Sequence, residues 1–175
     1  THLPPRPPPP PNSPGPFLFR PQTALLVRWN SNTDTPLPPD EPAGENPPEG
    51  AIIDYSLGAD ATGPVTLEIR DAQGKLVRHY ASTDAPPAEE PKLKIPRYWV
   101  RRPQVVSAAP GLHRLVWDLH GTPLPGVEPE YPMTAVAHET APRPTAPWVV
   151  PGNYSVVLTG GGQSCAAAAQ TALHH

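Results

Sequence analysis

Four side chains in one part of the sequence could support acid–base chemistry: Asp118, His120, Glu128 and Glu130. A glycosidase needs two carboxyl groups flanking a sugar site, and these residues are the best candidates in the chain. Asp118 and His120 would share a face if their strand continued through both, so that the acid would orient an imidazole base. We favour the competing interpretation, in which Asp118 closes a turn and His120 is solvated. Glu128 and Glu130 flank a proline in a long loop, where a catalytic geometry is hard to fix.

A second candidate site is the segment IPRYWVRRP, residues 95–103, within a long irregular insertion. Tyr98 and Trp99 supply aromatic faces, and Arg97 and Arg101 supply neighbouring guanidinium groups. Such a combination suits sugar rings, planar groups or acidic partners. The alternative, which we weight more heavily, is that Trp99 plugs the open end of the fold.

Other reaction classes lack their sequence signatures. A serine hydrolase needs a G-x-S-x-G elbow, but the string GGGQSC has glycines only before Ser164. A thiol nucleophile at Cys165 is conceivable, although it would lie in the least typical segment of the chain. The seven histidines show neither HxH nor HExxH spacing. We therefore expect no metal and no cofactor.

The elements that would position these residues are strands. Val65, Leu67 and Ile69 alternate with polar residues, the period of a half-buried strand, and residues 71–74 (DAQG) read as a hairpin turn. The predicted strands cover residues 23–30, 51–57, 65–71, 75–81, 112–119 and 154–159. The predicted core is Ile52, Leu67, Ile69, Val77, Leu115, Trp117, Val156 and Leu158. This pattern predicts an all-β fold, an immunoglobulin-like or fibronectin-III-like antiparallel sandwich with long proline-rich loops.

Composition limits the ordered part of the chain. Of 175 residues, 31 are proline, which is excluded from central strands, so the core must come from the proline-poor windows. The net charge of −3 and the scattered basic residues argue against nucleic acid as a partner. No apolar run approaches the ~20 residues of a membrane span. The single cysteine cannot form an internal disulfide and gives no information on the compartment.

Changes in composition along the sequence divide the chain into three regions. Residues 1–16 are a polyproline tail, an SH3- or WW-type ligand in one interpretation and a linker in the favoured one. Residues 17–159 form the predicted sandwich with an extended N-terminal segment. Residues 160–175 are an atypical tail whose alanine run has helical rather than strand propensity. His174 and His175 are interpreted as an affinity-tag remnant.

A string of motifs across residues 17–159 resembles a known class of protein domain. The motifs are NPPEGAIIDYSL, GPVTLEI with DAQGKLVR, GLHRLVWDLH and PGNYSVVLT. They look like the C-terminal region of large bacterial proteins with sialidase-like or sortilin-like Asp-box repeats, often labelled as glycosyl hydrolases. This region is similar to the immunoglobulin-like domain of flagellar hook-capping proteins. The resemblance implies an accessory domain behind a β-propeller, in a bacterial and exported parent protein.

The chain also departs from that class. No Asp-box (S-x-D-x-G-x-T-W) occurs, so none of the propeller's residues can be carried over. Proline and alanine runs are what GC-rich DNA yields when it is translated out of frame. We therefore hypothesise that the chain is a gene fragment with out-of-frame ends, as from a cloned environmental or genomic insert.

These observations favour a non-catalytic accessory sandwich that packs against a parent propeller or another protein domain, or binds carbohydrate. Without its neighbour, or without a final strand, such a fragment would expose an apolar patch and self-associate. The alternative is a small hydrolase, a glycosidase first and an esterase second, that was retained as an active fragment.

Overall fold

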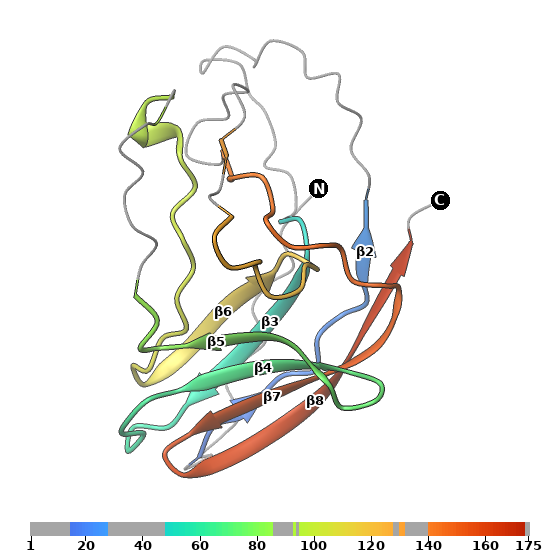
Figure 1. Cartoon of the computed structure of the whole chain (residues 1–175). Helices are drawn as coiled ribbons and strands as arrows, with labels where there is room; N and C mark the ends of the chain where they lie inside the picture. Colours follow the sequence, from blue (N-terminus) through green and yellow to red (C-terminus); the bar gives the residue numbers. More distant parts are fainter. Residues whose placement is uncertain are drawn as a thin grey trace, which may run out of the picture.

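The computed structural model describes residues 15–27, 48–85, 93, 95–127, 130–131 and 140–173. Within these ranges the chain folds into strands and a single 3₁₀ turn, arranged as two sheets with irregular loops beyond one end (Figure 1). The elements are β1 (Phe17–Leu18), β2 (Ala24–Leu26), β3 (Ala51–Leu57), β4 (Thr66–Asp71), β5 (Leu76–Ala81), η1 (Arg97–Trp99), β6 (Gly111–Trp117), β7 (Gly152–Gly160) and β8 (Gln163–Leu173). No helix in these ranges has the length and apolar character needed to cross a bilayer.

The two sheets pack face to face around one core. One has the strand order β1-β3-β6, and the other has the order β2-β8-β7-β4-β5. The predicted all-β class and the two-layer arrangement are therefore confirmed. Both sheets contribute fully or almost fully buried side chains to the shared cluster, and six predicted core residues are among them: Leu67, Ile69, Leu115, Trp117, Val156 and Leu158.

The β4–β5 hairpin forms at the predicted turn. The N–H of Gly74 donates to the carbonyl of Asp71 at 2.9 Å, and Gly74 has a φ of +78°, which glycine adopts without strain. The Asp71 carboxylate accepts hydrogen bonds from the N–H groups of Gln73 and Lys75 at 3.0 and 2.8 Å. A bulge interrupts the register between Ile69 and Arg70.

The predicted core assignment in β3 is out of phase by one residue. Ile53 is fully buried, whereas Ile52 lies on the opposite face of the strand and lines a cavity. The first three residues of the run AIID are apolar, so apolar side chains lie on both faces of the strand. The sequence pattern therefore did not determine which face of β3 packs in the core. Val77, also predicted for the core, is half-buried and packs against its margin.

The predicted boundary of the sandwich at residue 159 is corrected by β8. Gln163–Leu173 is an 11-residue strand that pairs with β7 from Gln163 to Thr171, despite the helical propensity of its alanines. Gly161 and Gly162, at φ of 58° and 76°, make the connecting two-residue turn. Tertiary pairing against a β-branched strand therefore overrides the intrinsic preference of the alanines.

The N-terminal strands also differ from expectation. The predicted strand 23–30 is reduced to the three residues of β2, while residues 28–30 lie outside the described ranges. β2 pairs with β8 in parallel, so the sandwich is not wholly antiparallel as predicted. The two-residue strand β1, which the sequence did not indicate, pairs with β3.

Candidate functional site

The aromatic segment predicted to bind ligands is a short 3₁₀ turn outside the core. In η1 the N–H of Trp99 donates to the carbonyl of Pro96 at 3.0 Å, and the N–H of Val100 donates to that of Arg97 at 3.1 Å. The rings of Tyr98 and Trp99 meet edge to face, with centroids 5.7 Å apart. Tyr98 is 62% exposed, and Trp99 is half-buried without belonging to the core cluster. The interpretation of Trp99 as a plug stays a prediction.

A second loop anchors this turn. The N–H of Thr140 donates to the carbonyl of Trp99 at 2.9 Å, and the N–H of Arg101 donates to the carbonyl of Thr140 at 2.8 Å. Thr140 is itself buried. Arg97 and Arg101 flank the aromatic pair along this segment. The backbone contact at Thr140 thus ties the segment that carries the two rings and the two arginines to a second loop.

Asp118 and His120 come together, but not on a strand. β6 ends at Trp117, and Leu119 has a φ of +58°, a left-handed conformation that is costly for a branched side chain. The Asp118 carboxylate accepts the His120 backbone N–H at 3.2 Å, and Nδ1 of His120 lies 2.7 Å from the Asp118 carbonyl. Because a carbonyl can only accept, Nδ1 carries the proton in this pair. The turn at Asp118 agrees with the favoured interpretation.

The expected solvation of His120 is wrong. Its side chain is 5% exposed, whereas that of Asp118 is 51% exposed. The imidazole packs against the indole of Trp148 with ring centroids 4.3 Å apart, and its own backbone carbonyl accepts from Nε1 of Trp117 at 2.9 Å. The structure therefore places His120 in an aromatic setting that orders the turn. Such a role accounts for its burial without any catalytic step.

Trp148 is a surface aromatic that the sequence reasoning missed. It is half exposed, and its loop is tied to the turn at 118–121 by the N–H of Val149 donating to the Leu119 carbonyl at 2.9 Å. The N–H of Gly121 donates to the carbonyl of Pro147 at 3.1 Å. No period or motif marks a tryptophan in a proline-rich loop, so only its contacts identify it.

Of the two remaining acidic candidates, the structure describes only Glu130. Glu130 lies 3.9 Å from Arg143, and both side chains are more than two-thirds exposed. Glu128 lies outside the described residues, so its predicted pairing with Glu130 stays a prediction. In the described ranges, His, Cys, Asp and Glu side chains form no group of three or more that could hold a metal ion.

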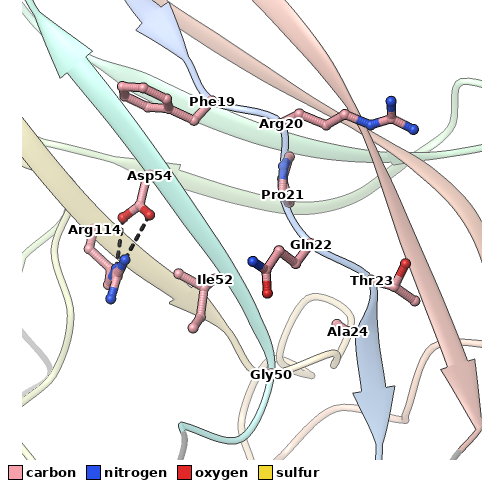
Figure 2. Close-up of a pocket in the computed structure, with 10 residues that line it drawn as sticks. All are labelled: Phe19, Arg20, Pro21, Gln22, Thr23, Ala24, Gly50, Ile52, Asp54 and Arg114. Atoms are coloured by element: carbon pink, nitrogen blue, oxygen red, sulfur yellow. Dashed lines mark hydrogen bonds and ion pairs between the residues drawn. The ribbon is translucent and has the colours of Figure 1, made fainter. Parts of the chain in front are cut away.

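A cavity of about 290 Å³ lies between the β1–β2 connection and the outer face of β3 (Figure 2). Asp54 and Arg114, directly opposite each other on β3 and β6, form a bidentate ion pair at its wall, with distances of 2.7 and 2.8 Å. Both side chains are almost buried, and the Asp54 carboxylate raises the pKa of Arg114 by hydrogen bonding to it. The remaining residues that line this cavity are Phe19, Arg20, Pro21, Gln22, Thr23, Ala24, Gly50 and Ile52.

A second cavity, of about 360 Å³, lies beside β5 and is closed by residues 103–105 and 122–123. The Arg78 guanidinium lies over the Tyr80 ring, 5.1 Å from its centroid, and Nη1 donates to the carbonyl of Gly121 at 2.8 Å. Burial raises the pKa of Tyr80 to about 12. Neither cavity contains the carboxyl pair that a glycosidase requires.

Comparisons with known proteins gave no match to any family model, any curated protein or any solved structure.

Proposed function

We propose that the chain is an accessory β-sandwich of immunoglobulin-like type that binds a partner through the loops at one end. The observation that carries the proposal is the Tyr98–Trp99 pair, held outside the core on an anchored turn with arginines on both sides. Exposed aromatic rings that contribute nothing to a core are typical of recognition surfaces.

Carbohydrate is the ligand class that this surface favours. Sugar rings stack on aromatic faces, and guanidinium groups donate hydrogen bonds to hydroxyl and carboxylate oxygens. The half-exposed Trp148 adds a further aromatic face from a neighbouring loop. In the context suggested by the sequence resemblance, such a domain would tether a parent propeller to a glycan, or pack against that propeller through the same surface.

The experiment is a glycan microarray probed with the tagged full chain, followed by titration of tryptophan fluorescence with each glycan that binds. Trp99→Ala and Tyr98→Ala should lower the affinity at least tenfold, because stacked aromatic rings dominate such contacts. Leu76→Ala is the matched control: its side chain is also exposed but lies on the β5 hairpin, so affinity should not change. Equal binding by all four proteins would refute the proposed surface.

The same preparations decide between a binding module and the hydrolase alternative. A panel of chromogenic glycosides and short-chain esters should show no turnover above buffer. If turnover appears and is lost in a folded Asp118→Asn or Glu130→Gln variant, the chain is an enzyme and the accessory function is wrong. Turnover that persists equally in both variants and fades with purification comes from a contaminant and leaves the binding proposal intact.

A further inference from the structure

Arg78 points from the edge strand β5 into the space between the two sheets. β5 is the outermost strand of its sheet, and Arg78 pairs directly with Ile69 of β4, which is fully buried in the core. Directly paired residues of an antiparallel ladder share a face, so the side chain of Arg78 leaves the strand on its core-facing side. The same holds for Tyr80, which pairs with the fully buried Leu67. A charged group on this face needs polar partners.

The partners of the Arg78 guanidinium are incomplete. Nη1 donates to the carbonyl of Gly121 at 2.8 Å, and the group lies over the ring of Tyr80. Nε is buried, and no hydrogen-bond acceptor meets it within the described ranges. Arg78 also takes part in none of the ion pairs formed within those ranges. Since buried polar groups in folded proteins nearly always have a partner, this Nε–H is a donor that lacks its acceptor.

Arg114 shows how this chain satisfies the same edge of a guanidinium elsewhere. Its Nε and Nη2 donate to the two carboxylate oxygens of Asp54 at 2.7 and 2.8 Å. The two parallel donors match a carboxylate in both geometry and charge. Arg78 donates from the other end of its guanidinium, through Nη1, and leaves Nε without such a partner in the described chain. A carboxylate is therefore the acceptor that suits Arg78.

Arg78 also lines the cavity of about 360 Å³ beside β5. This volume is at the lower end of the range for small-molecule sites, about 300–1,000 Å³. The hydroxyl of Thr122 and the amide of Gln104, which line the same cavity, are engaged with strand backbone. The cavity therefore combines a guanidinium that lacks an acceptor with apolar surface for a carbon skeleton. The apolar residues in the lining are Ala85, Pro103, Val105 and Pro123.

We propose that this cavity binds a small organic carboxylate, with Arg78 as the residue that recognises its charge. The carboxylate engages Nε and Nη2, as Asp54 engages Arg114, while Nη1 keeps its bond to Gly121. Because Nε is shielded from solvent, binding includes a rotation of the guanidinium about that bond, which turns the edge with Nε and Nη2 toward the cavity. The apolar lining then covers the rest of the ligand.

The other titratable groups in the lining permit an anion. Asp84 is exposed, and its Oδ2 accepts the N–H of Ala81 at 2.7 Å, so solvent and this bond screen its charge. His79 is also exposed and offers a ring N–H to an anion. The balance of charge at the cavity is therefore set by the half-buried Arg78.

Protection of the sheet edge is the competing role for Arg78. An inward-pointing charge on an edge strand discourages pairing with further strands. That role needs only the charge, so lysine would serve it equally well. A carboxylate held by two parallel donors needs the planar guanidinium instead. Arg78→Lys therefore separates the two roles.

The experiment follows the arginine Nε–H signals of the ¹⁵N-labelled full chain by NMR, with triple-resonance assignment, during titration with glucuronate or benzoate. The two probes distinguish a sugar acid from an aromatic acid, and glucose and benzyl alcohol are their neutral counterparts. The Arg78 Nε–H signal should move with at least one acid and with neither neutral compound. Backbone amide shifts of Gly121 and Thr122 give the affinity, which should fall at least tenfold in Arg78→Lys.

Arg70→Lys is the matched control, because Arg70 lies on the neighbouring strand β4, pairs with Glu68 and does not line the cavity. Its affinity should equal that of the wild type. Trp99→Ala should also bind the acid unchanged, which separates this site from the carbohydrate-binding surface. Circular dichroism and thermal unfolding establish that the variants are folded.

Three results would overturn the proposal. One is an Arg78 Nε–H signal that moves with neither acid. Another is an equal response to each acid and its neutral counterpart, which would mean that the carboxylate is not recognised. The third is equal affinity of Arg78→Lys and the wild type, which would leave Arg78 with edge protection alone.

Discussion

The two lateral sides of the sandwich satisfy their exposed strand edges in different ways. On the side of β5 and β6, loop side chains cap the edges. The side-chain amide of Gln104 accepts the N–H of Val116 and donates to its carbonyl, and Thr122 donates to the carbonyl of Val77 at 3.0 Å. On the opposite side, the outward groups of β8 meet no cap within the described chain. The Asp54–Arg114 ion pair belongs to neither edge, because it joins β3 and β6 across the outer face of the β1-β3-β6 sheet.

The comparison shows that side chains of particular loops, rather than the strands themselves, satisfy the backbone groups at a strand edge. Thr122 and Gln104 both belong to proline-rich insertions, which therefore contribute to the fold. The hairpin turn before β8 is too short to supply a cap.

The largest effect expected on stability is at the Asp54–Arg114 ion pair, on the outer face of the β1-β3-β6 sheet. Asp54→Ala leaves the Arg114 guanidinium almost buried without its carboxylate, which should lower the free energy of unfolding by about 3–5 kcal/mol. Urea unfolding followed by circular dichroism measures the change. Glu68→Ala is the control, since it removes a more exposed ion pair with Arg70 and should cost about 0–1 kcal/mol. Equal losses in the two variants would contradict a special role for the buried pair.

On the capped side, Gln104→Ala should lower the free energy of unfolding by about 1–3 kcal/mol. The side chain accepts the Val116 N–H at 2.7 Å and donates to its carbonyl at 3.3 Å, so its loss leaves an edge residue without either bond. The same urea measurement applies, with Gln73→Ala in the exposed β4–β5 turn as the control. A loss no greater than that of the control would show that solvent replaces the cap at no cost.

Alkaline pH should destabilise the capped side through Tyr80. Its pKa is about 12 in the folded protein, against about 10 when unfolded, so the folded state holds the proton longer. Stability is therefore complete below pH 10 and falls between pH 10 and 12, by up to roughly 2–3 kcal/mol from this group. Tyr80→Phe should flatten that decline in urea unfolding at stepped pH. An unchanged slope would indicate that Tyr80 ionises equally in both states.

The smallest effect is expected at Thr122. Thr122→Val removes one exposed hydroxyl from the edge of β5 and should cost about 0.5–1 kcal/mol. Thermal unfolding with Thr62→Val, a loop residue before β4, as the control gives the difference. A cost larger than that of Gln104→Ala would mean that the β5 cap, not the β6 cap, secures this side.

Part of the candidate site was accessible from the sequence. The segment with Tyr98 and Trp99 could be identified because aromatic rings in a long insertion have no periodic place in a core. The burial of His120 could not be predicted from the sequence. It depends on contact with Trp148 in another loop, and no sequence spacing relates the two loops. Asp118 was correctly assigned to a turn because an acid after a strand commonly caps one.

The all-β class, the β4–β5 hairpin and most of the core could be predicted from the sequence, because alternation and turn chemistry are local properties of a strand. Two features required the folded structure: the phase of β3, where apolar residues occupy both faces, and the formation of strand β8 from an alanine run. The phase of β3 depends on its pairing with β6 and on the core, and β8 depends on its pairing with β7 and β2, whose hydrogen bonds and packing outweigh weak local preferences.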